Sequence, residues 1–120
     1  MNERLVVLSV EDGEATVTLG ALFRYVTVPV AGTIVAVVVS PSADDAGLTV
    51  DINDDGVAAI SAIACATKAT PGTWISTHFG GAETPVSVGA DSVLSFDANS
   101  AAAATAIHID IWYLVGEKCV

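Results

Sequence analysis

The amino-acid sequence predicts an all-β protein, an antiparallel β-sandwich of eight to nine strands. Three observations support this class. Short runs alternate apolar and polar residues with a period of two, as along residues 48–53. Clusters of Gly, Pro, Asn, Asp and Ser separate these runs at short, regular intervals. The apolar residues are mostly Ala and Val, with many Ile and Thr residues beside them, and β-branched side chains suit a pleated sheet.

The first four predicted strands lie at residues 4–10, 14–19, 22–28 and 33–40. The first two form a hairpin that turns at Asp12-Gly13. A bend at residues 29–32, where Pro29 and Gly32 interrupt the apolar run, separates the third strand from the fourth. The fourth is a near-continuous run of Val and Ile, so we expect it to be buried on both faces.

The next two strands, residues 48–53 and 58–66, form a hairpin across the turn residues Asn53-Asp54-Asp55-Gly56, which tolerate left-handed backbone angles. The same stretch matches the opening of an EF-hand calcium loop through Asp51, Asn53 and Asp55. However, the position that requires a bidentate Glu falls on Ala62, and the flanking residues alternate with a strand period. A solvated turn is therefore favoured, and a weak surface calcium site at these three residues is the alternative. No cofactor is predicted.

The second half of the chain is predicted to form strands at residues 74–78, 85–88, 92–96 and 104–115, with a loop at residues 98–103. In the last strand, Ile107, Ile109, Ile111, Tyr113 and Val115 share one side. The other side carries His108, Asp110, Trp112 and Leu114. One side fills the core. We predict that the second side, which combines an aromatic with polar residues, lies in a subunit interface.

Composition limits the function classes. Hydrophobic residues make up 52% of the 120 residues and charged residues only 15%, so few polar groups are present to cover a monomer, which favours a buried subunit interface. The formal net charge of -10 opposes phosphate contacts, which argues against nucleic acids and anionic membranes. Acidity does permit docking onto a basic patch of a protein partner.

The length fits one domain, which we divide into an N-terminal hairpin or docking segment (1–20), a β-sandwich (21–116) and a C-terminal tail (117–120). No targeting segment is expected, and the longest apolar stretch, residues 25–39, is too short for a spanning helix. Cys65 and Cys119 are predicted to be free thiols, without a zinc-ligand pattern.

No enzyme is predicted. The closest match to a nucleophile elbow, residues 85–89, lacks the first glycine and a following helix. Composition alone leaves a Ser-His-Asp assembly open, because His78, His108, Asp110 and several serines are present. His108 is interpreted as a hydrogen-bonded surface or interface residue, with a pH-sensitive contact as the alternative. Trp74 is either a core anchor or an interface residue, with the core favoured.

Three short motifs, taken in order, resemble a family of small bacteriophage virion proteins. These are a P-x-x-G-T-I strand at residues 29–34, a V-D-I-x-x-x-G hairpin at residues 50–56 and a G-x-D-x-x-L-x-x-D strand at residues 89–97. The resemblance implies a jelly-roll-like sandwich of the kind found in capsid decoration proteins, head fibres and receptor-binding parts. Asp54 and the acidic Asp44-Asp45 pair depart from the pattern, which leaves the exact structural role open.

From this resemblance we expect a non-enzymatic decoration (cement) protein on the outer capsid surface of a virion, made in the host cytoplasm. It would bridge subunits of the major capsid protein, as a homotrimer, and dock through the N-terminal segment with Arg4, Leu5 and Val7. The alternative is a fibre or receptor-binding tip that contacts a host glycan or protein through loops 42–47 and 77–83. A third possibility is a free-standing sugar-binding sandwich with Trp74, His78 and Asp110 in its site.

Overall fold

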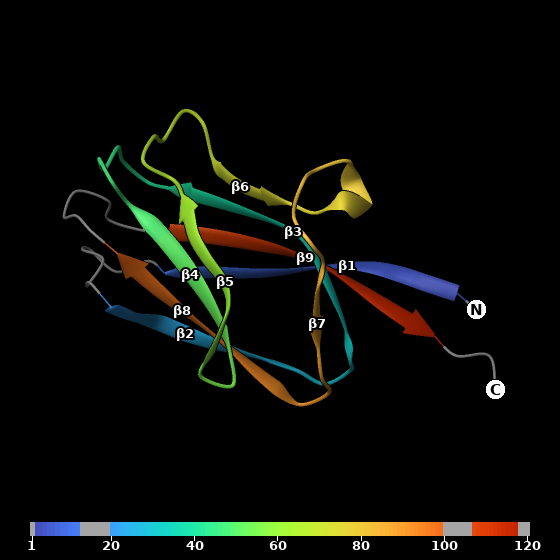
Figure 1. The fold of residues 1–120 in the computed structure, drawn as a ribbon. Coiled ribbons are helices and arrows are strands. Elements are labelled where there is room, and N and C mark those ends of the chain that lie inside the picture. The colour runs from blue at the N-terminus through green and yellow to red at the C-terminus, as the bar shows by residue number, and fades with distance from the viewer. Residues whose placement is uncertain (1, 13–19, 100–106, 118–120) are drawn as a thin grey trace.

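Nine antiparallel strands in two packed sheets make up the computed structural model, which describes residues 2–12, 20–99 and 107–117 (Figure 1). The five-stranded sheet contains β1 (Asn2–Asp12), β3 (Gly32–Pro41), β6 (Gly72–Ile75), β7 (Val86–Val88) and β9 (Ile107–Glu117). The four-stranded sheet contains β2 (Gly20–Val28), β4 (Thr49–Asp54), β5 (Val57–Ala64) and β8 (Ser92–Asn99). The predicted all-β sandwich is confirmed. In the described part of the chain, no helix is long and apolar enough to cross a membrane.

The strand order is β1-β9-β3-β6 in the larger sheet and β2-β8-β4-β5 in the smaller one. The long strand β3 pairs with β6 through one half of its length and with β7 through the other half, so these two short strands lie along the same edge of β3. Strands β1 to β4 thus alternate between the sheets. The jelly-roll-like connectivity expected from the sequence stays a prediction.

Strand β1 pairs with β9 along its whole length, from Asn2 opposite Glu117 to Asp12 opposite Ile107. Residues 14–19, which the sequence analysis assigned to a hairpin partner of this strand, lie outside the described residues. In the described part of the chain, the strand that pairs with β1 is therefore β9. The interpretation of residues 1–20 as a hairpin or docking segment stays a prediction.

The core follows the alternation that the sequence predicts. On β9, Ile107, Ile109, Ile111 and Tyr113 are buried, and the residues between them face outward. Strand β3 is buried from Ile34 to Val37, as its continuous apolar run predicts, and a register shift between Ile34 and Ala36 accompanies the break in alternation. The opposite sheet fills the space between the layers with Val50 and Ile52 of β4, Ile60 and Ile63 of β5, and Leu94, Phe96 and Ala98 of β8.

The predicted β4–β5 hairpin is confirmed. Its two loop residues, Asp55 and Gly56, both have positive φ angles, of 50° and 82°, which is the backbone of a type I′ turn. Asp55 also joins the turn to β8, because its backbone N–H donates to the Val93 carbonyl at 2.9 Å. Its Oδ1 accepts a hydrogen bond from the Val93 N–H at 2.8 Å. The acidic turn is thus a structural element of the sheet.

The strand predicted at residues 74–78 is wrong at its C-terminal end, because β6 ends at Ile75 and a short 3-10 helix, η1 (Thr77–Phe79), follows. The Ser76 hydroxyl accepts a hydrogen bond from the His78 N–H at 3.2 Å. Gly80 closes the helix with a φ of 80°. Capping by serine and a left-handed glycine therefore outweigh the β-propensity of this stretch.

Candidate functional site

The side chains predicted to form a subunit interface share one surface, the outer face of the five-stranded sheet. His108, Asp110, Trp112 and Leu114 alternate with the buried residues of β9. The register places Trp112 opposite Val7 and Leu114 opposite Leu5, and directly opposed residues of an antiparallel pair project from the same face. The predicted interface residues and two of the predicted docking residues therefore form one surface. Arg4 lies on the other face of β1.

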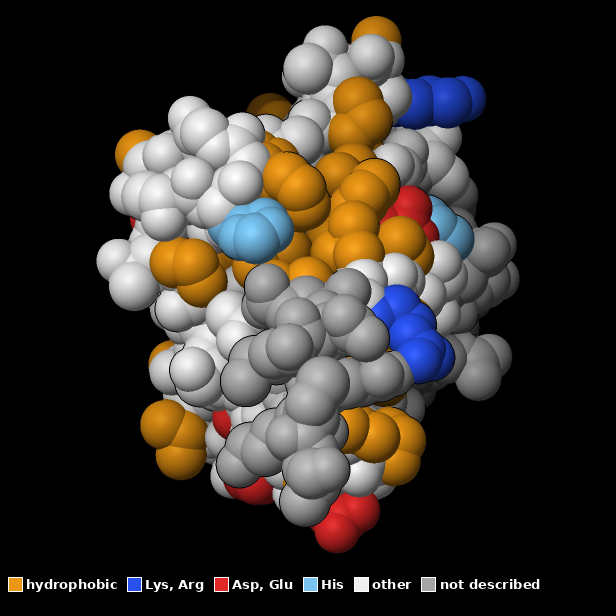
Figure 2. Space-filling model, turned by 90° about the vertical axis from the view of Figure 1, so that its right-hand side faces the viewer, with side chains coloured by type: hydrophobic (Ala, Val, Ile, Leu, Met, Phe, Trp, Pro, Cys, Tyr) orange, Lys and Arg blue, Asp and Glu red, His pale blue; other side chains and the backbone are white. Residues whose placement is uncertain are grey.

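This surface is apolar and continuous, and we call it the outer apolar face. It comprises Leu5 and Val7 of β1, Ala36 and Val38 of β3, Ile75 of β6, Phe79 of η1, and Trp112 and Leu114 of β9. Leu5, Val7 and Phe79 have exposed fractions of 39%, 45% and 44%. Figure 2 shows hydrophobic side chains gathered into one area on this side of the molecule. Exposed apolar area of this kind marks an interaction site.

Helix η1 adds an aromatic side chain that the sequence analysis did not assign to the surface. Phe79 packs edge-on against Trp112, with ring centroids 6.0 Å apart and an interplanar angle of 82°. His78 packs in the same way on Phe79 at 5.0 Å. A hollow of about 300 Å³ lies between Phe79, Trp112 and the apolar residues of β3 and β6. The adjoining Gly80 ends η1 in the left-handed conformation, directly after Phe79.

A polar cluster borders the outer apolar face. The Oδ1 atom of Asp110 accepts a hydrogen bond from the Ser9 hydroxyl at 2.7 Å and lies 2.8 Å from Nε2 of His108. In a Ser-His-Asp assembly the imidazole stands between the serine and the carboxylate, so that it can take the serine proton. Here the carboxylate stands between the other two groups. The cluster therefore orients side chains on the surface rather than activating a nucleophile.

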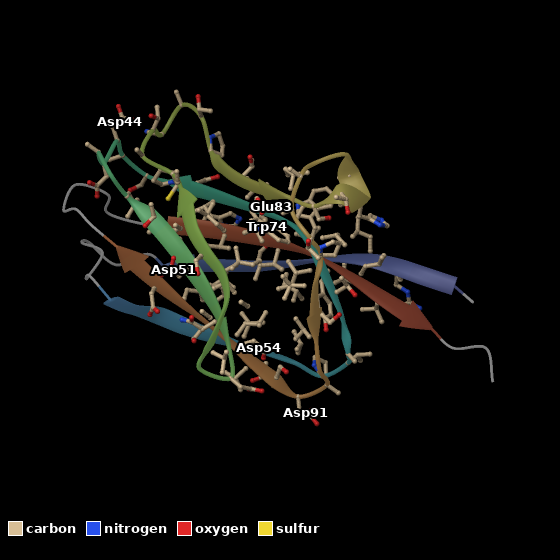
Figure 3. All side chains as sticks on the ribbon, viewed as in Figure 1. Asp44, Asp51, Asp54, Trp74, Glu83 and Asp91 are labelled. Atoms are coloured by element: carbon tan, nitrogen blue, oxygen red, sulfur yellow. The ribbon has the colours of Figure 1, made fainter. Side chains whose placement is uncertain are left out.

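The opposite sheet carries the acidic residues that suggested calcium (Figure 3). Oδ1 of Asp51 accepts a hydrogen bond from the Ala62 N–H at 2.6 Å. Asn53 donates through Nδ2 to Oδ2 of Asp97 at 2.8 Å, and Asp55 binds the backbone of β8. The polar groups that the calcium alternative requires thus act in hydrogen bonds to two other strands, β5 and β8. Among the residues that the structure describes, no group of three or more His, Cys, Asp or Glu could hold a metal ion.

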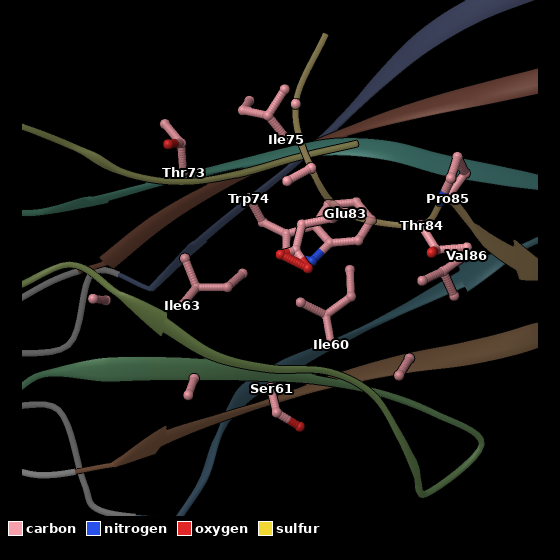
Figure 4. Close-up of a pocket in the computed structure, with 15 residues that line it drawn as sticks. Ile60, Ser61, Ile63, Thr73, Trp74, Ile75, Glu83, Thr84, Pro85 and Val86 are labelled. Atoms are coloured by element: carbon pink, nitrogen blue, oxygen red, sulfur yellow. The ribbon is translucent and has the colours of Figure 1, made fainter. Parts of the chain in front are cut away.

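A groove of about 840 Å³ lies between β5 and β6, and residues 81–86 complete its lining (Figure 4). Trp74, Ile60 and Ile63 form its apolar floor, and Glu83 is the ionisable residue of its lining. Trp74 packs against the core and pairs with the buried Val37, so it faces inward. Asp110 pairs with Val38 and faces outward. Two of the three residues of the sugar-site alternative are thus separated by the sheet.

Cys65 is a free, buried thiol, as predicted, whereas Cys119 lies outside the described residues. The Sγ atom of Cys65 lies 3.7 Å from the Leu48 carbonyl oxygen, to which it donates a weak hydrogen bond. Burial, with a smaller contribution from the negative charge of Asp45, raises the pKa of the Cys65 thiol to about 11. A thiol with so high a pKa carries little thiolate near neutrality, so Cys65 is a packing residue rather than a nucleophile.

Comparison of the chain with known protein families, with curated proteins and with solved structures gave no match in any of the three.

Proposed function

We propose that this protein is a non-enzymatic capsid decoration protein that binds to the outside of a virus head and stabilises it. Two observations support this role. The order of the three motifs resembles that in small bacteriophage virion proteins, and the protein presents an apolar face on a rigid sheet. The outer apolar face carries the proposal, because it is a surface that water disfavours and a partner would cover.

The proposed action is adhesion. The residues of this face are held by the sheet register and by core residues directly beneath them, such as Ile111 under Trp112. Little conformational entropy is therefore lost when a partner binds. Trp112 stands beside Phe79 near the middle of the face, the position in which an aromatic residue contributes most to an interface. We propose that this part joins the copies of a homotrimer, and that the β1 margin with Arg4, Leu5 and Val7 contacts the major capsid protein.

The distribution of charge supports a protein partner. Among the side chains that the structure describes, Asp110 is the carboxylate of the outer apolar face, and it is bound to Ser9 and His108. Asp51 and Asp97 lie on the four-stranded sheet, and Asp55 and Asp91 lie in its turns. A molecule with a net charge of -10 would thus approach a basic shell surface favourably while its apolar face makes the contact.

The test is binding to purified shells that lack decoration. The wild-type protein is expected to bind with saturation at a fixed ratio to the shell subunits. Val7→Asp places a charge in the outer apolar face and should abolish binding. Val57→Asp is the matched control, because Val57 is more exposed, at 70%, but begins β5 on the other sheet, and should bind normally. Absence of saturable binding by the wild type, or equal loss in both variants, would contradict the proposal.

A second candidate is a fibre or receptor-binding tip, which the groove beside Trp74 favours. The groove combines an indole with one carboxylate, Glu83, and its wall includes residues 81–83 of a predicted contact loop. Aromatic rings beside polar groups are common in sites for sugars and peptides. Binding of the protein to host cells, lost in Trp74→Ala and retained in Val7→Asp, would favour this role over decoration.

A further inference from the structure

Among the described strands, β1 pairs through one of its two edges only. It is the terminal strand of the five-stranded sheet, and one of its edges pairs with β9 through eleven consecutive residue pairs without a register shift. No strand in the described part of the chain pairs with its other edge. A long, regular edge strand presents a row of backbone N–H and C=O groups that can pair with another chain.

The other edges of the two sheets are protected. Strand β5 has two register shifts against β4, and β2 has one against β8. Such bulges hinder the addition of a further strand. The segment after β6 is covered by the chain itself, since the Thr77 N–H donates to the Glu83 carbonyl at 2.9 Å and the Glu83 N–H donates to the Ile75 carbonyl at 3.2 Å. Among the described strands, β1 is thus the long edge strand that has neither a bulge nor a covering segment.

The middle of β1, from Leu5 to Leu8, is apolar on both faces. Leu5 and Val7 are exposed on the outer apolar face. Val6 and Leu8 point to the other side, where they line a cavity of about 400 Å³ together with Val28, Val30 and Tyr113. This cavity exists because β1 and β9 extend past the end of the four-stranded sheet (Figure 1). A strand that covered this edge would therefore need apolar residues on both of its faces, and β1 itself meets that requirement.

We propose that two copies of the protein pair through β1, antiparallel, about a two-fold axis at Leu8. In this register Arg4 lies opposite Asp12 of the second copy, and Val6 lies opposite Val10. Opposite charges in such pairs stabilise a sheet, and the symmetry makes each pair occur twice. An axis at Val7 would instead place Glu3 opposite Glu11. The charge pattern of β1 thus favours one self-pairing register, which gives a continuous ten-stranded sheet across the two copies.

This contact is distinct from the trimer contact proposed for the outer apolar face, because it uses the edge of the sheet, and Arg4 is the residue that it shares with the proposed capsid contact. It adds a two-fold contact between copies to the trimer contact proposed for that face. The two-fold pair is also expected in solution, without any shell.

Cysteine cross-linking tests the register. In a Cys119→Ser background, Leu8→Cys places two thiols on the axis, at the Cβ separation of about 4.5–5.5 Å that directly opposed residues have. Mild oxidation should therefore convert most of this variant to a covalent dimer. Leu5→Cys is the control on the same strand. The new thiols of the two copies would lie about 20 Å apart, so this variant should not form a covalent dimer. Equal cross-linking of both variants, or none of Leu8→Cys, would overturn the register.

Charge reversal tests the pairing without cysteines. Arg4→Asp should weaken self-association in sedimentation velocity, and so should Asp12→Arg, because each variant places like charges opposite one another. The double variant Arg4→Asp/Asp12→Arg restores opposite charges and should recover the wild-type association. Circular dichroism will establish that each variant is folded. A wild-type protein without any two-fold association at high concentration, or a folded double variant that does not recover it, would refute the proposal.

Discussion

The buried thiol of Cys65 makes the stability of the fold depend on pH in a predictable way. Cys65 has an exposed fraction of 1%, and burial raises the pKa of its thiol from the ordinary 9.0 to about 11. In the unfolded chain the thiol loses its proton near pH 9, whereas in the folded protein it keeps the proton up to about pH 11. Its contribution to stability is therefore complete below pH 9 and is lost as the pH rises toward 11.

The size of the effect follows from these two pKa values. Each pKa unit corresponds to about 1.4 kcal/mol, so the two-unit difference is worth at most about 2.7 kcal/mol once both states are ionised. At pH 8 the loss is only about 0.1 kcal/mol, and at pH 10 it reaches about 1.4 kcal/mol. That is a large share of the stability of a small domain.

The measurement is denaturant unfolding of the wild type and of Cys65→Ala at pH 7, 8, 9 and 10. Alanine suits this site, because it keeps the Cβ of Cys65 and removes only the buried sulfur. Burial also raises the pKa of Tyr113, but both proteins contain Tyr113, so its effect cancels in the difference. The wild type should lose about 1.3 kcal/mol more than the variant between pH 8 and pH 10. Parallel pH profiles would refute the assigned environment of the thiol.

Three further substitutions test other parts of the structure. Trp112→Ala should lower the free energy of unfolding by only about 1 kcal/mol, because Trp112 is half-exposed. The same variant should no longer bind to shells in a sedimentation assay. Asp51→Ala should lower the free energy of unfolding by about 1 kcal/mol, because the Asp51 carboxylate accepts a hydrogen bond from the Ala62 N–H at 2.6 Å. Addition of calcium should leave the melting temperature of the wild type unchanged. Gly81→Ala should lower the melting temperature strongly, because the new Cβ would lie 2.1 Å from the Ile75 carbonyl oxygen.

Each of these variants has a control or an outcome that contradicts the reasoning. For Gly81→Ala the control is Gly89→Ala, whose Cβ would meet only the Ser92 hydroxyl at 3.6 Å and should be tolerated. A rise in the wild-type melting temperature with calcium that Asp51→Ala abolishes would revive the metal site. Normal shell binding by folded Trp112→Ala would show that the trimer contact proposed for Trp112 is not needed for adhesion.

Several local features could be predicted because they depend on residues close together in the chain. The period-two alternation of residues 107–115 assigns Ile109 and Ile111 to the core and Trp112 to the outside, since the side chains of a strand alternate between its faces. The turn at Asp55-Gly56 follows equally from residues that accept positive φ angles. Where local signals compete, as at Ser76, the prediction was wrong about the end of the strand.

The sequence by itself determined the all-β class, most strand positions and the face of β9 that remains exposed. Only the tertiary structure decided that β1 pairs with β9, that Leu5 and Val7 therefore continue the surface of Trp112, and that Phe79 joins it from η1. The physical reason is that alternation is a property of one strand, whereas sheet neighbours are chosen by packing between segments that lie a hundred residues apart. The same distance explains why the position of β1 at the end of the sheet, among the strands that the structure describes, becomes visible only in the tertiary structure.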